Sequence, residues 1–270
     1  GRLSPAVSPL SHSWERARER VALLLPLPEL PMNTLIVHAH PEPQSFCTAM
    51  KDLAVATLEG AGHAVQVSDL YAMNWNPVAS AADFQARSNP DYLIYALEQR
   101  EAVKAGVIAA DIAAELDKLL WADLVILNFP LFWCSLPAML KGWIDRVLVS
   151  GTCYGGLRFY DRGGLAGKRA LLSFSLGGQQ HMFEDEDAVH GAWEPMLRPL
   201  QRGTLAYVGM QVLPPFAAYH VPYISPEARG VILDQYRDYL LRLESVARLR
   251  FPSLADFDRD LRPLGQEVPA

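Results

Sequence analysis

The chain has 270 residues, half of them hydrophobic and a fifth charged, which suits one large globular domain with a well-filled core. Its net charge of -6 argues against nucleic acid or an anionic membrane as partner, since either favours a basic patch, and no apolar run reaches the roughly 18 residues of a membrane span. Three cysteines, Cys47, Cys134 and Cys153, fit no metal-binding spacing and indicate a reducing compartment, which we take to be the cytoplasm.

Residues 1–31 differ from the rest in being rich in proline and in having no strand or helix periodicity. The short apolar run 21–25 ends at Pro26 and follows acidic residues, a poor match to a signal peptide. We therefore expect residues 1–31 to be a disordered or upstream-translated leader, and the folded domain to begin at Met32. The domain is expected to span 32–250, followed by a tail, 251–270, that wraps a partner subunit or is loose.

From Met32 onward, short apolar runs alternate with stretches of helical periodicity. Near-continuous apolar strands separated by helices are typical of a parallel sheet covered on both faces, so we predict an α/β, doubly wound sheet of five strands in the order 2-1-3-4-5. Residues 71–104 form a long connection, which we interpret as functional. Strands are expected at 34–40, 64–70, 124–129, 169–176 and 210–216, and helices at 45–59, 108–120, 137–149, from 190 or 193 to 205, and 226–247.

Ligands of such sheets bind beyond the carboxyl ends of the strands, which directs attention to three segments. The first, 40–46, has no glycine-rich phosphate fingerprint, but it places Ser45 at a helix N-terminus. Free N–H groups and the helix dipole favour a phosphate there, whereas a plain helix cap is the alternative role of Ser45. His40 is either a ligand contact or a hydrogen-bonded residue at the strand end.

The second segment, 129–137, gathers aromatic side chains between two prolines. Such a cluster can wall a flat ring, although core packing is the alternative. On the helix that follows, Asp145 and Arg146 are adjacent and cannot face each other, so one of them is expected to bind a neighbouring residue.

The third segment begins with Gly177 and Gly178, which let the backbone approach a ligand and offer N–H donors to it. The loop after them carries His181 and His190, either of which could stabilise charge near pH 7 or simply be a surface residue. The acidic run 184–187 is interpreted as solvated, and no metal site is predicted.

Several long motifs in the same order resemble the NAD(P)H quinone oxidoreductases, the DT-diaphorase family. They are TLIVHAHPEPQSF at 34–46, DLYAMNWNP at 69–77, ADLVILNFPLFW at 122–133, LPAMLKGWIDRV at 136–147, the pairs at 177–178 and 190–191, and PEAR at 226–229. The resemblance covers roughly residues 33 to 250. It implies a flavodoxin-like fold and a homodimer with one FAD per active site, shared between the subunits.

The resemblance also implies roles for individual residues. Cofactor contacts are His40, Ser45, Phe46 and Cys47 at the phosphates and ribityl chain, Pro130, Leu131, Phe132 and Trp133 along the ring, Ser175, Leu176, Gly177 and Gly178 at its polar edge, and Asp145 and Arg229 elsewhere on FAD. The acceptor pocket is expected to include Trp133, Tyr154, Phe183 and His190, with His190 and Gly178 catalytic.

The implied activity is two-electron hydride transfer from NAD(P)H, through the flavin, to a quinone or a similar small aromatic acceptor that uses the same slot, which gives ping-pong kinetics. His190 is the candidate for stabilising charge on the reduced flavin. Phe183 replaces a tyrosine of the animal members, so a tyrosine–histidine relay cannot operate as it does in the family, and His181 or water is the alternative partner of such a relay. Ile94 and Phe132 replace glutamines, and Cys47 an asparagine, so FMN is an alternative to FAD, although Arg229 and the long C-terminal helix favour FAD.

Two other functions remain open on this reading. The same flavin could reduce nitroaromatic or azo compounds, because the pocket would tolerate many flat acceptors. A flavin-binding regulatory subunit of a potassium-efflux system is the alternative outside enzymes, whereas an aromatic pocket and His190 argue against a simple electron carrier.

Overall fold

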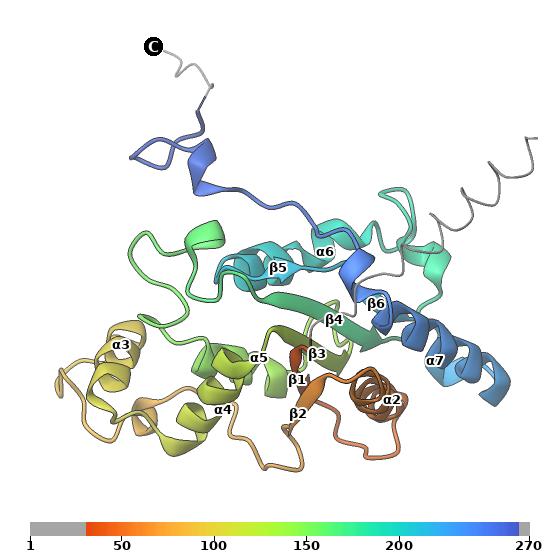
Figure 1. The fold of residues 1–270 in the computed structure, drawn as a ribbon, viewed down its shortest axis with the longest axis horizontal. Coiled ribbons are helices and arrows are strands. Elements are labelled where there is room, and N and C mark those ends of the chain that lie inside the picture. The colour runs from red at the N-terminus through yellow and green to blue at the C-terminus, as the bar shows by residue number, and fades with distance from the viewer. Residues whose placement is uncertain (1–30, 265–270) are drawn as a thin grey trace, which may run out of the picture. The chain divides into compact units, whose positions relative to one another are not determined.

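The computed structural model describes residues 31–264, so the predicted leader, apart from Pro31, and the end of the tail lie outside the described residues. A six-stranded, entirely parallel sheet forms the centre, with the order β2-β1-β3-β4-β5 and with β6 also paired to β4 (Figure 1). The strands are β1 Asn33–His38, β2 Ala64–Asp69, β3 Leu124–Pro130, β4 Arg169–Ser175, β5 Gln211–Val212 and β6 Phe216–Ala218. The helices are α2 Phe46–Gly60, α3 Tyr95–Ala105, α4 Ala110–Trp121, α5 Ala138–Val147, α6 Trp193–Leu200 and α7 Pro226–Leu240.

The predicted strand order is confirmed, and the predicted fifth strand is split in two. Gln211 of β5 lies opposite Arg169, and Phe216 of β6 lies opposite Ser173, so the outer strand has one residue more than β4 between these points. Pro214 and Pro215 occupy the interruption, and because proline has no N–H to donate to the ladder, pairing stops there and resumes beyond it.

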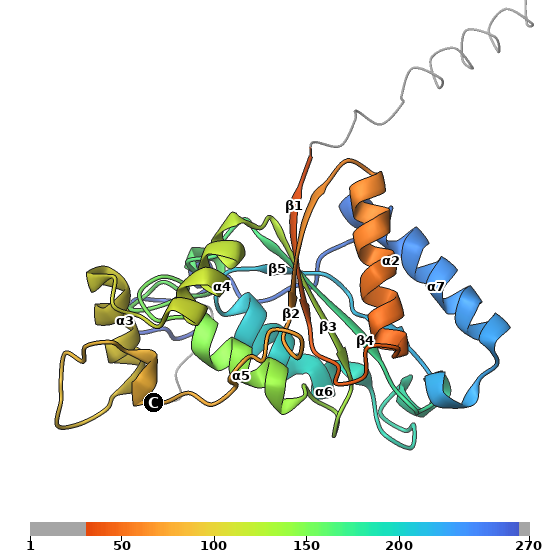
Figure 2. The same ribbon diagram turned by 90° about the horizontal axis from the view of Figure 1, so that it is seen from below.

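Helices cover both faces of the sheet, as Figure 2 shows. On one face, Ile36, Ile126 and Leu171 pack with residues of α2 and α7 in one buried cluster. On the other face, alternate residues of the same strands pack against α4, α5 and α6. This period-two alternation between two apolar faces explains why the strand sequences are apolar throughout.

Three helical segments differ from the prediction. The connection 71–104 contains most of helix α3, which the sequence did not predict. The helix is capped at its C-terminus by Gly106, whose backbone is in the left-handed conformation. Pro199 lies inside α6, and the chain continues from Gln201 to Ala206 as a π-helix, because proline removes a backbone donor and disturbs the regular ladder. Helix α7 ends at Leu240, earlier than predicted, and a short 3₁₀ turn follows at Leu243–Ser245.

Within 31–264, no helix is both long and apolar enough to cross a membrane. The described part of the tail lies against the domain. Leu249 donates its N–H to the carbonyl of Val212 at 2.8 Å, and Asp161 accepts from the Ser253 hydroxyl at 2.8 Å and from the Leu254 N–H at 2.9 Å.

Candidate functional site

The N-terminus of α2 lies at the carboxyl end of β1. Ser45 caps the helix, with its hydroxyl oxygen accepting from the Thr48 N–H at 3.1 Å. The N–H groups of Phe46 and Cys47 have no hydrogen-bond partner among the described residues. His40 fixes the preceding turn by accepting from the Glu42 N–H at 3.0 Å. Unpaired N–H groups at the positive end of a helix are suited to an anionic group such as a phosphate.

The aromatic segment after β3 forms a strained turn. Phe132 and Ser135 exchange both backbone hydrogen bonds, so Trp133 and Cys134 are the two central residues of a hairpin turn, with φ of 52° and 56°. Bulky residues rarely occupy this left-handed region, and the strain costs on the order of 1–2 kcal/mol per residue. Trp133 is 99% exposed. A large apolar side chain displayed in this way indicates a surface that contacts a ligand or another chain.

The glycine turn after β4 presents backbone donors. Phe183 lies beneath it, since a Cβ added to Gly178 would stand 2.6 Å from the Phe183 ring. Phe183 is only 6% exposed and stacks on Trp193 with ring centroids 4.2 Å apart. The ring therefore supports the turn and has little surface left for an acceptor, in contrast with the predicted substrate contact.

His190 is exposed at the end of the same loop. Its ring lies 4.9 Å from that of Phe183, and its N–H donates to the carbonyl of Met182 at 3.0 Å. Phe183 thus contacts both the glycine turn and His190, which keeps the histidine near the turn. His181, the other histidine of the loop, is also exposed.

Hydrogen bonds join these segments at one edge of the sheet. The Cys47 thiol lies 3.0 Å from the Ser175 hydroxyl, and the Leu131 N–H donates to the Ser175 carbonyl at 2.8 Å. Burial raises the pKa of Cys47 to about 11, so this side chain is a neutral thiol below the surface, and the backbone N–H of Cys47 is the group that it offers to a phosphate. Ser175 therefore links α2, the aromatic turn and the glycine turn.

A buried polar chain that we did not predict runs beneath Ser45. His38 is 1% exposed and its Nδ1 lies 2.6 Å from Asn128 Oδ1, while its Nε2 lies 3.3 Å from the Thr48 hydroxyl. The Thr48 hydroxyl is 3.0 Å from that of Ser45. Burial lowers the pKa of His38, although the hydrogen bond to Asn128 opposes the shift. The sequence signal was a polar residue inside each of two apolar strands, at positions that turn out to be paired.

Comparisons with known proteins agree with this geometry. Residues 32–243 match a family described as having the flavodoxin-like fold. Ribosyldihydronicotinamide dehydrogenase (quinone) of Mus musculus is 45% identical over 215 residues, which cover 79% of this chain and 91% of the mouse protein. NAD(P)H dehydrogenase (quinone) 1 of Rattus norvegicus is 41% identical, over 84% of this chain and 82% of the rat protein. The chain belongs to the NAD(P)H quinone oxidoreductase family.

A solved structure extends the similarity to three dimensions. A candidate quinone reductase from Klebsiella pneumoniae superposes with a TM-score of 0.82 at 35% identity, covering 88% of this chain and 98% of that one. Members of this family bind a flavin and use NAD(P)H, which agrees with a site at the carboxyl edge that offers backbone donors and an exposed aromatic ring.

Of three further residues that the family resemblance placed in the site, Tyr154 and Asp145 lie away from the carboxyl edge in this subunit, whereas Arg229 contacts Val221, which pairs with Leu176 beside the glycine turn. Tyr154 belongs to the segment between α5 and the start of β4, where its ring packs 5.8 Å from Tyr207 at the amino end of the sheet. The Asp145 carboxylate pairs with Lys141 of its own helix at 2.6 Å. Arg229, in the first turn of α7, donates from Nε to the Val221 carbonyl at 3.2 Å.

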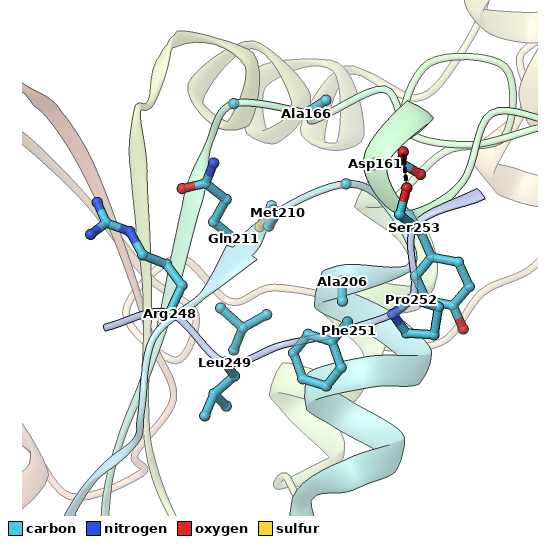
Figure 3. Close-up of a pocket in the computed structure, with 14 residues that line it drawn as sticks. Asp161, Ala166, Ala206, Met210, Gln211, Arg248, Leu249, Phe251, Pro252 and Ser253 are labelled. Carbon is cyan, nitrogen blue, oxygen red and sulfur yellow. Dashed lines mark hydrogen bonds between the residues drawn. The ribbon is translucent and has the colours of Figure 1, made fainter. Parts of the chain in front are cut away.

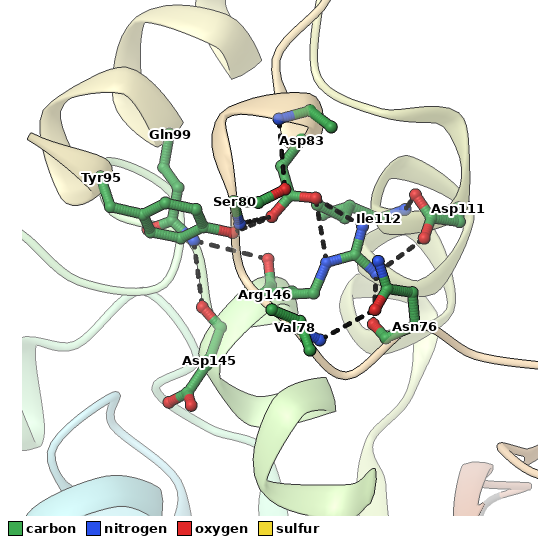
Figure 4. A network of polar contacts seen from close by, with 11 residues as sticks. Asn76, Val78, Ser80, Asp83, Tyr95, Gln99, Asp111, Ile112, Asp145 and Arg146 are labelled. Carbon is green, nitrogen blue, oxygen red and sulfur yellow. Dashed lines mark hydrogen bonds and ion pairs between the residues drawn. The ribbon is translucent and has the colours of Figure 1, made fainter. Parts of the chain in front are cut away.

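Arg146, the neighbour of Asp145, is the residue that binds across elements. Its guanidinium donates to Asp83 at 2.8 Å, to Asp111 at 2.7 Å and to the Asn76 carbonyl at 2.9 Å, which ties the connection 71–104 and α4 to α5 (Figure 4). We expected one of the adjacent pair to bind a neighbour, and both do.

Several cavities among the described residues lie away from the carboxyl edge, and two of them are the largest of these. One, of about 270 Å³, opens between β5 and the tail at the amino end of the sheet, where Gln211, Arg248 and Phe251 line it (Figure 3). The other, of about 460 Å³, is lined by Trp193, Arg202 and the tail. Neither contains the aromatic turn, the glycine turn or the N-terminus of α2, so the carboxyl edge remains the candidate active site.

Proposed function

We propose that this chain is a flavin-dependent NAD(P)H:quinone oxidoreductase that works as a homodimer with one FAD per site. One observation carries the proposal: unpaired backbone donors at the N-terminus of α2 and at the glycine turn lie at the same sheet edge as the exposed ring of Trp133. A flavin has matching parts, since its phosphates are anionic, its ring is flat and the polar edge of that ring accepts hydrogen bonds. The family relationship supplies the activity.

Each part of the edge has a role in this proposal. The N–H groups of Phe46 and Cys47, with the Ser45 hydroxyl, bind the phosphates, and Phe132 and Trp133 wall the ring. When bound, the flavin would accept hydride from NAD(P)H and deliver it to the quinone, while the protein orients the ring and tunes its charge. His190 supplies a donor or a positive charge near the glycine turn, where negative charge develops.

A second subunit completes the acceptor pocket in this proposal. Tyr154 and Tyr207 lie at the amino end of the sheet and cannot line the pocket of their own subunit beside His190. A partner copy can bring this aromatic pair, together with Phe159, against the exposed Trp133. The choice of FAD over FMN rests on Arg229, which offers a cation at the start of α7 for the adenosine side. Three free cysteines agree with a reducing compartment such as the cytoplasm.

The experiment is an absorbance spectrum of the purified protein, followed by anaerobic addition of NADH or NADPH and then of benzoquinone. We expect a flavin spectrum that bleaches with the nicotinamide and returns fully with the quinone. Bound flavin that never bleaches would favour the regulatory alternative, and faster turnover of a nitroaromatic or azo compound than of any quinone would favour the other enzyme. No binding of FAD or FMN after reconstitution would overturn the proposal.

His190→Ala tests the assigned role, with His181→Ala as a matched control from the same loop. The first variant should retain flavin and slow its reduction by NAD(P)H roughly 100-fold, in the range of general acid–base effects. The second should reduce at the wild-type rate. Equal pre-steady-state rates in both would remove His190 from the reaction.

A further inference from the structure

His220 holds the glycine turn by two hydrogen bonds from one residue. Its backbone N–H donates to the Gly178 carbonyl at 2.9 Å, and its ring Nδ1 lies 2.9 Å from the Gly177 carbonyl. A carbonyl oxygen only accepts, so Nδ1 must carry the proton. The neighbouring bonds from Leu176 to Ala218 and from Val221 to Leu176 extend the pairing of β4 with β6, which brings His220 to this position.

The backbone of His220 is specialised for the contact. Its φ is 57°, in the left-handed region that only a few per cent of non-glycine residues adopt, asparagine, aspartate and histidine most often. In that conformation both the ring and the N–H of His220 face the glycine turn. The strain is therefore coupled to two contacts with consecutive carbonyls, a pattern found where the surrounding structure requires one local geometry.

The two contacts set the direction of the donors of the turn. In a trans peptide the C=O and N–H point in opposite directions. Because His220 binds the carbonyls of Gly177 and Gly178, the N–H groups of Gly178 and Gln179, which belong to the same two peptides, point away from it. Neither N–H has a hydrogen-bond partner among residues 31–264. Consecutive unpaired N–H groups form a concavity that binds negative charge.

We infer that His220 is a positioning residue for the flavin: it fixes the Gly177–Gly178 turn so that the N–H groups of Gly178 and Gln179 meet the polar edge of the ring. The inference rests on the proposed function and adds a residue to the flavin site that the family resemblance did not include. Phe183 supports the turn from the other direction, through its contact with Gly178. The donors would stabilise the negative charge of the reduced flavin, so His220 should affect the midpoint potential as well as the affinity.

Three variants at this position separate the donor from other effects. His220→Asn keeps a donor at the atom equivalent to Nδ1 and tolerates positive φ, so it should bind flavin as the wild type does. His220→Gly removes the donor without backbone strain, and we expect roughly fivefold to tenfold weaker binding. His220→Asp is isosteric with asparagine but places an acceptor against the Gly177 carbonyl, so its binding should be weakest.

Flavin affinity, measured by fluorescence quenching with FAD and with FMN, and the midpoint potential of the bound flavin are the readouts. If His220 positions the turn through its donor, the midpoint potential in His220→Asn should equal that of the wild type. If the residue is merely structural, all three variants should lose thermal stability, and the potential in His220→Asn should differ from that of the wild type. Equal affinity and potential in wild type and His220→Gly overturn the inference while the proposed function stands. A wild-type chain that binds neither flavin overturns the proposed function, and the role of His220 with it.

Discussion

Two buried polar clusters in this molecule differ in charge and in what they leave unpaired. Around Arg146, the guanidinium neutralises the buried carboxylate of Asp83 and also binds the exposed carboxylate of Asp111, and Tyr95 and backbone groups complete the hydrogen bonds of Asp83. Around His38, every member is neutral, and the chain of contacts ends at the Ser45 hydroxyl on the candidate site.

This difference in unpaired groups indicates that the Arg146 cluster stabilises the fold, whereas the His38 cluster supports the candidate site. Both oxygens of Asp83 are bonded, and burial, which would raise its pKa, is outweighed by the bonds from Arg146 and Tyr95, so the pKa of Asp83 is lowered. By contrast, the Ser45 hydroxyl accepts from the Thr48 N–H and can direct its own proton to Thr48 or to a ligand. A saturated cluster fixes the fold, whereas an unsaturated end at a surface can respond to a bound anion.

The largest effect is expected from Arg146→Ala. Removing the cation leaves the Asp83 carboxylate, 2% exposed, without its partner, which should lower the free energy of unfolding by about 3–5 kcal/mol. Urea denaturation measures the loss. Arg198→Ala is the control, because its exposed contact with Glu194 is 3.7 Å long and such pairs contribute less than about 1 kcal/mol. Similar losses in the two variants would contradict the structural role of the Arg146 cluster.

In the neutral cluster, removing one polar partner should cost more stability than removing both, which a double-mutant cycle of His38 and Asn128 can measure. Asn128→Leu leaves the buried His38 Nδ1–H without an acceptor, and we expect a loss of about 1–3 kcal/mol. His38→Leu with Asn128→Leu removes both polar partners, so the double variant should be more stable than the two single losses predict, and Thr48 can still donate to the Glu42 carbonyl. Urea midpoints of the four chains test this. Additive losses would mean that the two side chains do not interact.

These clusters also mark the limit of what the sequence could predict. The apolar runs gave the strands and their order, because burial on both faces leaves a strong pattern, and the serine before the first helix was recognisable as a cap. The pairing of His38 with Asn128 depends on the register of β1 against β3, which the apolar pattern of two fully buried strands does not fix.

His220 left no signal at all. Its contact with Gly177 follows from β6 resuming its pairing with β4 after two prolines, and from a positive φ that no local sequence pattern marks. Tyr154 shows a different limit, since its predicted place in the pocket came from family resemblance and requires a second copy of the chain. Local patterns therefore predicted the framework, whereas the residues that position the site depend on contacts between distant segments.

The smallest effect we predict is a pH dependence that arises from His38. Burial lowers its pKa below 6.5 in the folded chain, with Asn128 and the Asp69 carboxylate opposing the shift and Lys51 and His40 adding to it. Below pH 6.5 the unfolded chain therefore binds a proton that the folded chain does not. The stabilisation is present above this pH and is lost as the pH falls toward the folded pKa, by at most about 1.4 kcal/mol per pH unit.

His38→Gln is the matched variant for this effect, because it keeps a polar side chain beside Asn128 and does not titrate. His40 also has a pKa lowered by burial, but it is present in both chains, so the difference between them isolates His38. Urea denaturation at a series of pH values from about 7.5 to about 5 should show the wild type losing stability faster than the variant. A flavin phosphate above Ser45 would favour protonated His38, so the difference should shrink in the flavin-bound protein, whereas the Arg146 cluster should not respond. Parallel losses in wild type and variant would show that His38 has the same pKa in the folded and the unfolded chain, and would contradict the prediction.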